Sequence, residues 1–413
     1  MSESFFNSRW IERPRQLHDS AALPAGFRFA GVACGVKDPA ATGLDVGLVV
    51  SDVADTVSAA RFCDSGVLAA PVVLTRERCD LHALRAVVVN SGNANAATGE
   101  AGIEQAILVQ EAAAGALALD PRQVAVASTG VIGVLLPGER IAAGVPDLVA
   151  ALDGDATAFA HAIRTTDVLD KHVSLTVDLP SGSIGLSAQC KGAGMISPRF
   201  ATMLCFVQTD AALRAQTAEL LLGVTVKRSF DRISVDGQLS TNDTVILMAS
   251  GASGVVVEPE SEDELCFGEA LDALLRQLAL RIVADGEGAR RIARVHVRGG
   301  GEREVARVAR AVANSPLVKA ALFGGDANWG RVAQAIGAAL PGSAPLRFDI
   351  AIEGVTVARD GAAAEHDAGA LAAAVARDEV AYEIDLEGAG AEAELFFSDL
   401  SYDYVKINAE YTT

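Results

Sequence analysis

The chain has 413 residues, of which 50% are hydrophobic and 5% aromatic, and it carries 34 Lys and Arg against 53 Asp and Glu. This apolar content is enough to bury a sizeable core, which excludes an intrinsically disordered chain. The net charge of −19 would repel a polyphosphate, so the composition argues against nucleic-acid binding. The length suits two domains of ordinary size or one large duplicated body.

The apolar runs and the cysteines indicate the cellular location of the protein. No stretch approaches the roughly 18 consecutive apolar residues that a membrane helix needs. Residues 1–27 lack the continuous apolar region of a secretory signal. The six cysteines are scattered without a CxxC pair, which is typical of reduced, mostly buried thiols. We therefore expect a soluble cytoplasmic protein that contacts no membrane.

In the first half of the chain, apolar spacing predicts helices interspersed with strands. Helices are expected at 101–118, where Asp120–Pro121 ends the helix, and at about 138–152 and 155–164. Strands are expected at 124–127, near 172–178 and at 184–189, the last two joined into a hairpin by residues 180–182. Ser128–Gly130 is expected to form a turn.

The clearest helix of the second half is expected at about 262–284, with Ser261 as its N-cap and Glu264 as the reciprocal partner of a capping box. Period-2 alternation predicts strands at 347–352, 381–386, 393–397 and 404–408. The mixture of helices and strands predicts an α+β or layered α/β fold.

The most unusual segment runs from Lys191 to Asp210. A strand ends at Lys191 and is followed by glycines and a proline, and Thr202 then opens an apolar run that is typical of a buried strand. A threonine so placed is a candidate internal nucleophile: it attacks the carbonyl of Ala201, and hydrolysis of the resulting ester frees its own α-amino group as a general base. From spacing alone, the favoured interpretation is an ordinary β-branched strand residue, with glycines that only shape a turn.

The run KGAGMISPRFATML (191–204) resembles the signature of the ornithine acetyltransferases, the ArgJ family of bifunctional glutamate N-acetyltransferases. Further blocks resemble that family in the same order, and together they cover about residues 27–413. They are VVVNSGNANAATGEAG (87–102), STGVIG (128–133), TTD (165–167), SFDRISVDGQLSTNDTVILMASG (229–251), VADGEGAR (283–290), NSPLVKAALFGGDANWGRVAQAIG (314–337) and INAEYTT (407–413).

The resemblance implies a DmpA/ArgJ-like self-cleaving fold with stacked β-sheets flanked by helices. It implies cleavage between Ala201 and Thr202 into an α chain (1–201) and a β chain (202–413), assembled as an α2β2 heterotetramer. Thr202 would carry acetyl from N-acetylornithine to glutamate in a ping-pong cycle of arginine biosynthesis. Thr129 and Gly130 match the family's oxyanion hole. Substrate contacts carry over to Thr165 or Thr166, Lys191, Glu287, Asn408 and Thr413.

Departures from the family pattern put the exact substrate in question. Arg199 and Phe200 replace the residues usual before the cleavage point, Val168–Lys171 replaces Thr-x-Pro-Lys, and Ala60–Ser65 departs from the usual GVFT block. Asn328–Arg331, a family hallmark, is interpreted as structural. The open alternatives are a self-cleaving amidase or aminopeptidase, an acetyltransferase of secondary metabolism with another acceptor, and a non-enzymatic relic. No metal or cofactor is expected, since the histidines form no cluster; acetyl-CoA remains a possible second acetyl donor.

Overall fold

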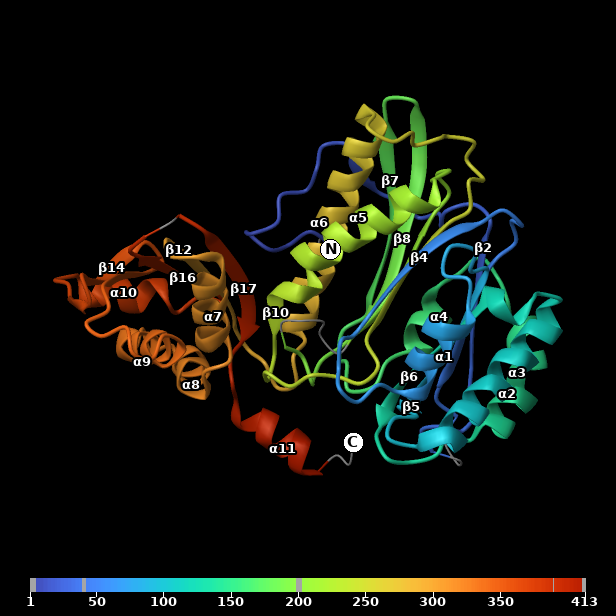
Figure 1. Ribbon diagram of the computed structural model, residues 1–413, viewed down its shortest axis with the longest axis horizontal. Coiled ribbons are helices and arrows are strands. Elements are labelled where there is room, and N and C mark those ends of the chain that lie inside the picture. The colour runs from blue at the N-terminus through green and yellow to red at the C-terminus, as the bar shows by residue number, and fades with distance from the viewer. Residues whose placement is uncertain (1–4, 39–41, 198–202, 389, 411–413) are drawn as a thin grey trace.

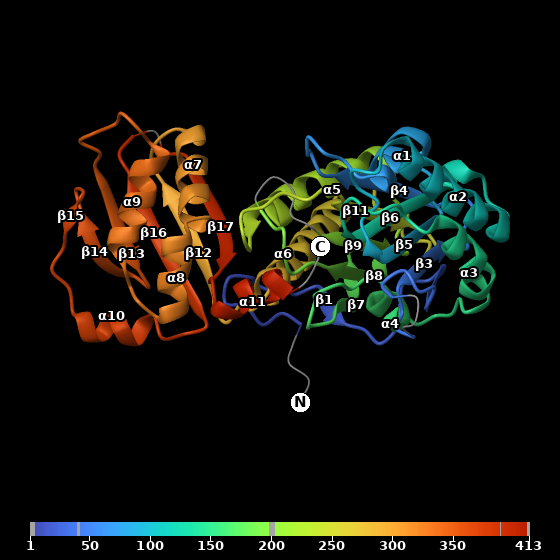
Figure 2. The same cartoon turned by 90° about the horizontal axis from the view of Figure 1, so that it is seen from below.

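Three β-sheets organise the chain in the computed structural model, which describes residues 5–38, 42–197, 203–388 and 390–410. Two of the sheets stack face to face between layers of helices, and the third forms a separate lobe (Figures 1 and 2). This arrangement confirms the predicted α+β class with stacked sheets flanked by helices.

The six-stranded sheet has the order β1 (Leu17–Asp19), β7 (Lys171–Leu179), β8 (Gly182–Lys191), β9 (Leu204–Thr209), β11 (Thr244–Ala249) and β4 (Val57–Phe62). Its neighbours are antiparallel except for β9 and β11, which run parallel. Strands β9 and β11 are buried at every position, which explains the apolar runs Leu204–Val207 and Val245–Ala249.

The four-stranded sheet has the order β2 (Phe27–Val32), β3 (Val46–Ser51), β5 (Ala86–Asn93) and β6 (Val124–Val131). It stacks on the six-stranded sheet through a shared aromatic core, in which Phe206 of β9 packs edge-to-face on Phe159, and Phe159 on Phe29 of β2. The ends of β6 and β8 therefore lie in neighbouring layers.

Helices cover the two outer faces of this sandwich. The six-stranded sheet is covered by α5 (Ala215–Arg228) and α6 (Glu262–Ala284), and the four-stranded sheet by α1 (Ala70–Arg78), α2 (Gly99–Leu117) and α3 (Gly138–Ala150). Phe159 belongs to α4 (Thr157–Ala162), at the edge between the sheets. Short 3₁₀ turns occur at Pro121–Gln123 and Phe230–Arg232.

The second lobe is a seven-stranded sheet with the order β10 (Ile233–Ser234), β17 (Glu392–Ser398), β12 (Ile292–Arg298), β16 (Glu379–Leu386), β13 (Phe348–Ile352), β14 (Val355–Arg359) and β15 (Ala362–Ala363). Its strands alternate between buried and less buried residues, as expected for a sheet with one covered face. The helices of this lobe are α7 (Glu302–Ala313), α8 (Pro316–Gly324), α9 (Trp329–Ala339) and α10 (Ala368–Ala374).

The last helix, α11 (Tyr402–Glu410), leaves the seven-stranded lobe and runs toward the sandwich (Figure 1). The strand predicted at 404–408 is therefore wrong. Ser401 accepts a hydrogen bond from the Tyr404 amide at 3.2 Å, which caps the helix, and the side chain of Asn408 donates back to the Tyr404 carbonyl. The apparent alternation reflects a helix with one lightly buried face rather than a strand.

Two local predictions are also wrong. The expected turn at Ser128–Gly130 is the end of strand β6, because the parallel ladder with β5 continues through it. At the start of α6, Ser261 caps the amide of Glu264 as expected, but the Glu264 carboxylate accepts from the amide of Glu260 rather than from Ser261. The other predicted helices and strands are confirmed, and Asn328 has the expected structural role, because its side chain caps α9 through the amide of Arg331.

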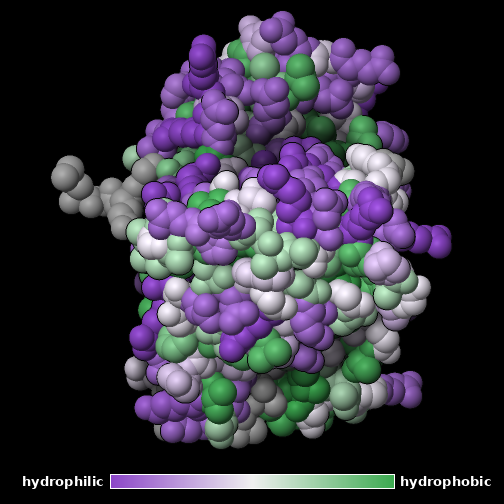
Figure 3. Space-filling view, turned by 90° about the vertical axis from the view of Figure 1, so that its left-hand side faces the viewer, coloured by the Kyte–Doolittle hydropathy of each residue, from purple (hydrophilic) through white to green (hydrophobic). Residues whose placement is uncertain are grey.

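On the side of the seven-stranded lobe, hydrophilic and hydrophobic residues are interspersed over the surface (Figure 3).

Of the six free cysteines, Cys63, Cys190 and Cys205 are buried and the other three are half-buried. Among the residues that the structure describes, no helix is long and apolar enough to cross a membrane.

Candidate functional site

Two strand ends from different sheets meet at the centre of the candidate site. Lys191 is the last residue of β8, and Thr129 lies near the end of β6. The Nζ of Lys191 donates to the Oγ1 of Thr129 at 3.2 Å, and both side chains are buried. The structure thus brings together two residues that are 62 positions apart in the sequence.

Gly130, beside Thr129, occupies a position that no other residue could take. Its φ is +135°, and a Cβ would lie 2.3 Å from the carbonyl carbon of Gly92 on β5. The β5–β6 register shifts at Gly92 and Asn93, which marks a bulge. Bulges re-aim backbone groups at the ends of strands and are frequent beside active sites.

The charge of Lys191 is poorly solvated. Burial lowers the pKa of this lysine, while the carboxylate of Asp167 acts in the opposite direction. Asp167 also accepts a hydrogen bond from the amide of Gly192 at 2.7 Å, so it holds the backbone directly after Lys191. An anionic ligand entering here would find a desolvated ammonium group to pair with.

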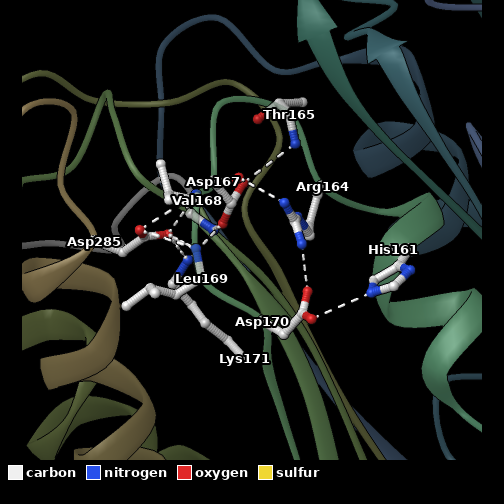
Figure 4. A network of polar contacts seen from close by, with 10 residues as sticks. His161, Arg164, Thr165, Asp167, Val168, Leu169, Asp170, Lys171 and Asp285 are labelled. Atoms are coloured by element: carbon white, nitrogen blue, oxygen red, sulfur yellow. Dashed lines mark hydrogen bonds and ion pairs between the residues drawn. The ribbon is translucent and has the colours of Figure 1, made fainter. Parts of the chain in front are cut away.

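Asp167 belongs to a buried ionic network that joins three predicted site segments (Figure 4). The ammonium of Lys171 bonds Asp167 Oδ1 at 2.7 Å and also bonds Asp285, and all three side chains are almost fully buried. Burial opposes ionisation of Asp167, yet the charges of Lys171 and Lys191 hold its pKa well below the ordinary value. Asp285 in turn accepts from the amides of Val168 and Leu169.

Glu287 is held against the loop that follows Lys191. Its amide donates to the carbonyl of Ala193 at 2.9 Å, and a Cβ on Gly194 would lie 2.7 Å from its carboxyl group. The side-chain amide of Asn408, on α11, donates to Glu287 Oε2 at 2.7 Å. The C-terminal helix thus reaches the same loop as the Lys191–Thr129 pair.

Five of the predicted site residues are brought together by the contacts above: Thr129, Gly130, Lys191, Glu287 and Asn408. Thr165 and Thr166 are half-buried, and the amide of Thr165 donates to Asp167 Oδ2 at 3.2 Å. Ala201, Thr202 and Thr413 lie outside the described residues, as do Arg199 and Phe200.

Three connecting residues, Asp167, Lys171 and Asp285, were missed by the sequence reasoning. Asp167 and Asp285 lie inside the TTD and VADGEGAR blocks, so their signal was a carboxylate within a motif already singled out. In the divergent segment 168–171, the side chains of Val168 and Leu169 are exposed while their amides are bonded to Asp285. Among the described residues, no group of three or more His, Cys, Asp or Glu is arranged to hold a metal ion.

Known proteins with similar sequences belong to one family. The family model described as the ArgJ family matches residues 28–413. The arginine biosynthesis bifunctional protein ArgJ of Symbiobacterium thermophilum is 44% identical over 401 residues, which are 96% of this chain and 99% of that protein. The protein of the same name from Geobacter sulfurreducens is 44% identical over 393 residues, covering 94% and 99%.

Two solved structures are similar as well. The bifunctional protein ArgJ of Bacillus halodurans is 35% identical, with a TM-score of 0.47, over 50% of this chain and 98% of that one. Ornithine acetyltransferase of Mycobacterium tuberculosis, solved with ornithine, is 39% identical, with a TM-score of 0.39, over 46% and 97%. On the sequence matches, the chain is an acetyltransferase. It belongs to the ArgJ family, the bifunctional enzymes of arginine biosynthesis.

Proposed function

We propose that the chain cuts itself between Ala201 and Thr202 and that the resulting α and β chains together transfer acetyl from N-acetylornithine to glutamate. The family assignment supports the reaction class, and the name of the M. tuberculosis relative, solved with ornithine, supports the donor. Residues 1–201 supply Thr129, Gly130 and Lys191, and residues 202–413 supply Glu287 and Asn408.

One observation carries this proposal: the Lys191–Thr129 contact. The Lys191 ammonium can only donate, so the hydroxyl oxygen of Thr129 accepts. The hydroxyl proton of Thr129 is therefore directed away from Lys191 and is available to a developing oxyanion. With the amide of Gly130, it supplies two donors at one strand end.

In the proposed cycle, Thr202 Oγ attacks the acetyl carbon of N-acetylornithine and the C–N bond breaks. The hydroxyl proton passes to the leaving nitrogen through the α-amino group of Thr202, and ornithine departs. The amine of glutamate then attacks the acetyl ester, and its proton returns to Thr202 as the C–O bond breaks. Water does not take part after the initial self-cleavage, in which it hydrolyses the Ala201–Thr202 ester.

Substrate binding is assigned to the two charged ends of the site. Donor and acceptor both carry an α-carboxylate, which Lys191 can receive in turn. The side-chain ammonium of ornithine suits the carboxylate of Glu287, which Asn408 orients through its 2.7 Å hydrogen bond. Thr165 or Thr166, Thr202 and Thr413 complete the proposed contacts. The α2β2 assembly, the use of acetyl-CoA as a second donor, and the cytoplasmic location remain predictions.

The test is a steady-state assay of the purified protein with N-acetylornithine and glutamate, and separately with acetyl-CoA and glutamate. We expect acetylglutamate to form from N-acetylornithine with parallel double-reciprocal lines, because ornithine leaves before glutamate binds. Intersecting lines would require a ternary complex. Ornithine release at the same rate without glutamate, and no acetylglutamate with it, would make the protein a hydrolase.

A further inference from the structure

The segment Ser234–Thr244, which leads from β10 into β11, contacts both flanks of the stretch that contains Ala201 and Thr202. The last described residue before that stretch is Ser197 and the first after it is Met203. Hydrogen bonds from the segment reach Met195 and Ile196 on one side and Met203 on the other. Two buried or half-buried carboxylates, Asp236 and Asp243, make these bonds.

On the upstream side, Asp236 fixes the backbone at two consecutive residues. Its Oδ2 accepts from the amide of Met195 at 2.7 Å, and its Oδ1 accepts from the amide of Ile196 at 3.0 Å. The Ile196 carbonyl in turn accepts from the amide of Val235 at 3.0 Å. Met195 has a φ of +53°, an uncommon conformation for a residue with a side chain, so this geometry depends on surrounding contacts such as those of Asp236.

On the downstream side, Asp243 holds the residue directly after Thr202. Its Oδ1 accepts from the Met203 amide at 3.0 Å, and the Met203 carbonyl accepts from the amide of Thr244 at 3.2 Å. Asp243 is 1% exposed, and its carboxyl group interacts with the side chain of Ser240 as well as with the Met203 amide. The contact with Met203 itself uses one carboxyl oxygen, Oδ1.

The same segment also fixes the strand that carries Thr129. The side-chain amide of Asn242 donates to the carbonyl of Ser128 at 2.8 Å and to that of Ala94 at 2.7 Å. Ser128 immediately precedes Thr129 on β6. Residues 234–244 thus bind three backbone sites: before the cleavage point, after it, and beside the proposed oxyanion hole.

We propose that Ser234–Thr244 is a clamp for self-cleavage, in which Asp236 and Asp243 are positioning residues that hold the two flanks of the Ala201–Thr202 bond. This rests on the proposed function. In the first step, Thr202 Oγ bonds to the Ala201 carbonyl carbon, the C–N bond breaks, and the hydroxyl proton ends on the freed nitrogen. Neither Asp236 nor Asp243 gains or loses a proton in this step. Fixing both flanks lowers the barrier by removing conformations in which the hydroxyl and its target carbonyl are apart.

The experiment follows conversion of the full-length chain into two chains during cell-free synthesis and chase, by denaturing electrophoresis and intact mass. We expect Asp243→Ala and Asp236→Ala to slow cleavage at least about tenfold, since each removes backbone hydrogen bonds. Asp243→Asn should restore most of the rate, because one oxygen is enough and burial already raises the pKa of this carboxyl well above its usual range. Asp236→Asn should stay slow, since an amide nitrogen cannot accept from Met195 or Ile196.

Asp210 provides a matched control at the opposite end of β9. Its carboxylate also accepts from two backbone amides, those of Gly185 at 2.7 Å and Ala25 at 3.0 Å. Asp210→Ala should lower the unfolding temperature yet cleave at the wild-type rate. Equal slowing by Asp210→Ala, or wild-type cleavage in both clamp alanine variants, would overturn the clamp. If Asp243→Ala does not fold, the contrast between Asp243→Asn and Asp236→Asn decides. A wild-type chain that never cleaves overturns self-cleavage itself.

Discussion

At the residue scale, Lys191 places an ammonium group at the buried end of β8, where it donates to the neutral hydroxyl of Thr129. A buried ammonium with a weak acceptor is costly on its own, and burial lowers the pKa of Lys191 accordingly. Under the proposed function, a bound α-carboxylate would pair with the Lys191 ammonium and favour its charged form.

The role of the Thr129 hydroxyl can be tested with a substitution that keeps the volume of the side chain. Thr129→Val keeps the volume but removes the donor, so we expect kcat to fall about 10²-fold with little change in KM, since the bond strengthens in the transition state. Thr129→Ser should recover most of the activity. The measurement is steady-state kinetics with N-acetylornithine and glutamate.

Thr209→Val is the control for this series, since Thr209 is also a buried strand threonine whose hydroxyl bonds a carbonyl, that of Gly185. It lies at the other end of β9 and should leave kcat unchanged. A large rise in KM of Thr129→Val with normal kcat would instead assign Thr129 to ground-state binding.

At the element scale, the Asp167–Lys171–Asp285 network ties the start of β7 to the end of α6 (Figure 4). Lys171→Met should destabilise the protein by about 3–5 kcal/mol, because it leaves two carboxyl groups buried without their shared cation. The check is urea unfolding followed by circular dichroism.

The comparison variant for Lys171 is Arg28→Met. Arg28 pairs with Asp52 across an exposed surface, with side chains 42% and 47% exposed, so its loss should cost less than about 1 kcal/mol. Equal effects of the two substitutions would mean that the buried network contributes no more than a surface ion pair.

Elements with strong periodicity were predictable from the sequence, and elements that depend on distant contacts were not. Helix α6 follows from its leucine face and its Ser261 cap, which are local features. The bulge at Gly130 depends on the approach of Gly92, and helix α11 depends on a cap from Ser401 against an ambiguous apolar pattern. Neither is encoded in the spacing of the segment itself.

The same distinction applies to the candidate site: its residues were predictable from motifs, but their contacts were not. Motif resemblance indicated Thr129, Gly130, Lys191, Glu287 and Asn408, because each lies in a block with a recognisable pattern. It did not indicate that Lys191 contacts Thr129, since that contact joins strands from different sheets. It also did not indicate that Asp167 bonds both the Gly192 amide and Lys171. Pairing of such segments is a property of the folded chain.

At the scale of the whole molecule, the proposed cut falls between two strands that are neighbours in one sheet. Strand β8 precedes the Ala201–Thr202 bond and β9 follows it, and they pair antiparallel from Leu186–Thr209 to Lys191–Leu204. The six-stranded sheet as a whole contains β1, β4, β7 and β8 from residues 1–201 and β9 and β11 from residues 202–413. Cleavage would thus divide the chain without dividing a strand.

This arrangement predicts that the two chains stay together after cleavage and separate only on unfolding. The cleaved wild type should elute as one species that contains both chains, at the same volume as uncleaved Thr202→Ala. Because unfolding of the cleaved form also releases a chain, its unfolding temperature should rise with protein concentration more steeply than that of Thr202→Ala. Calorimetry over a hundredfold range of concentration measures both slopes. Two chains that separate on dilution in native buffer, or identical slopes in the cleaved and uncleaved forms, would contradict an interface built from a shared sheet.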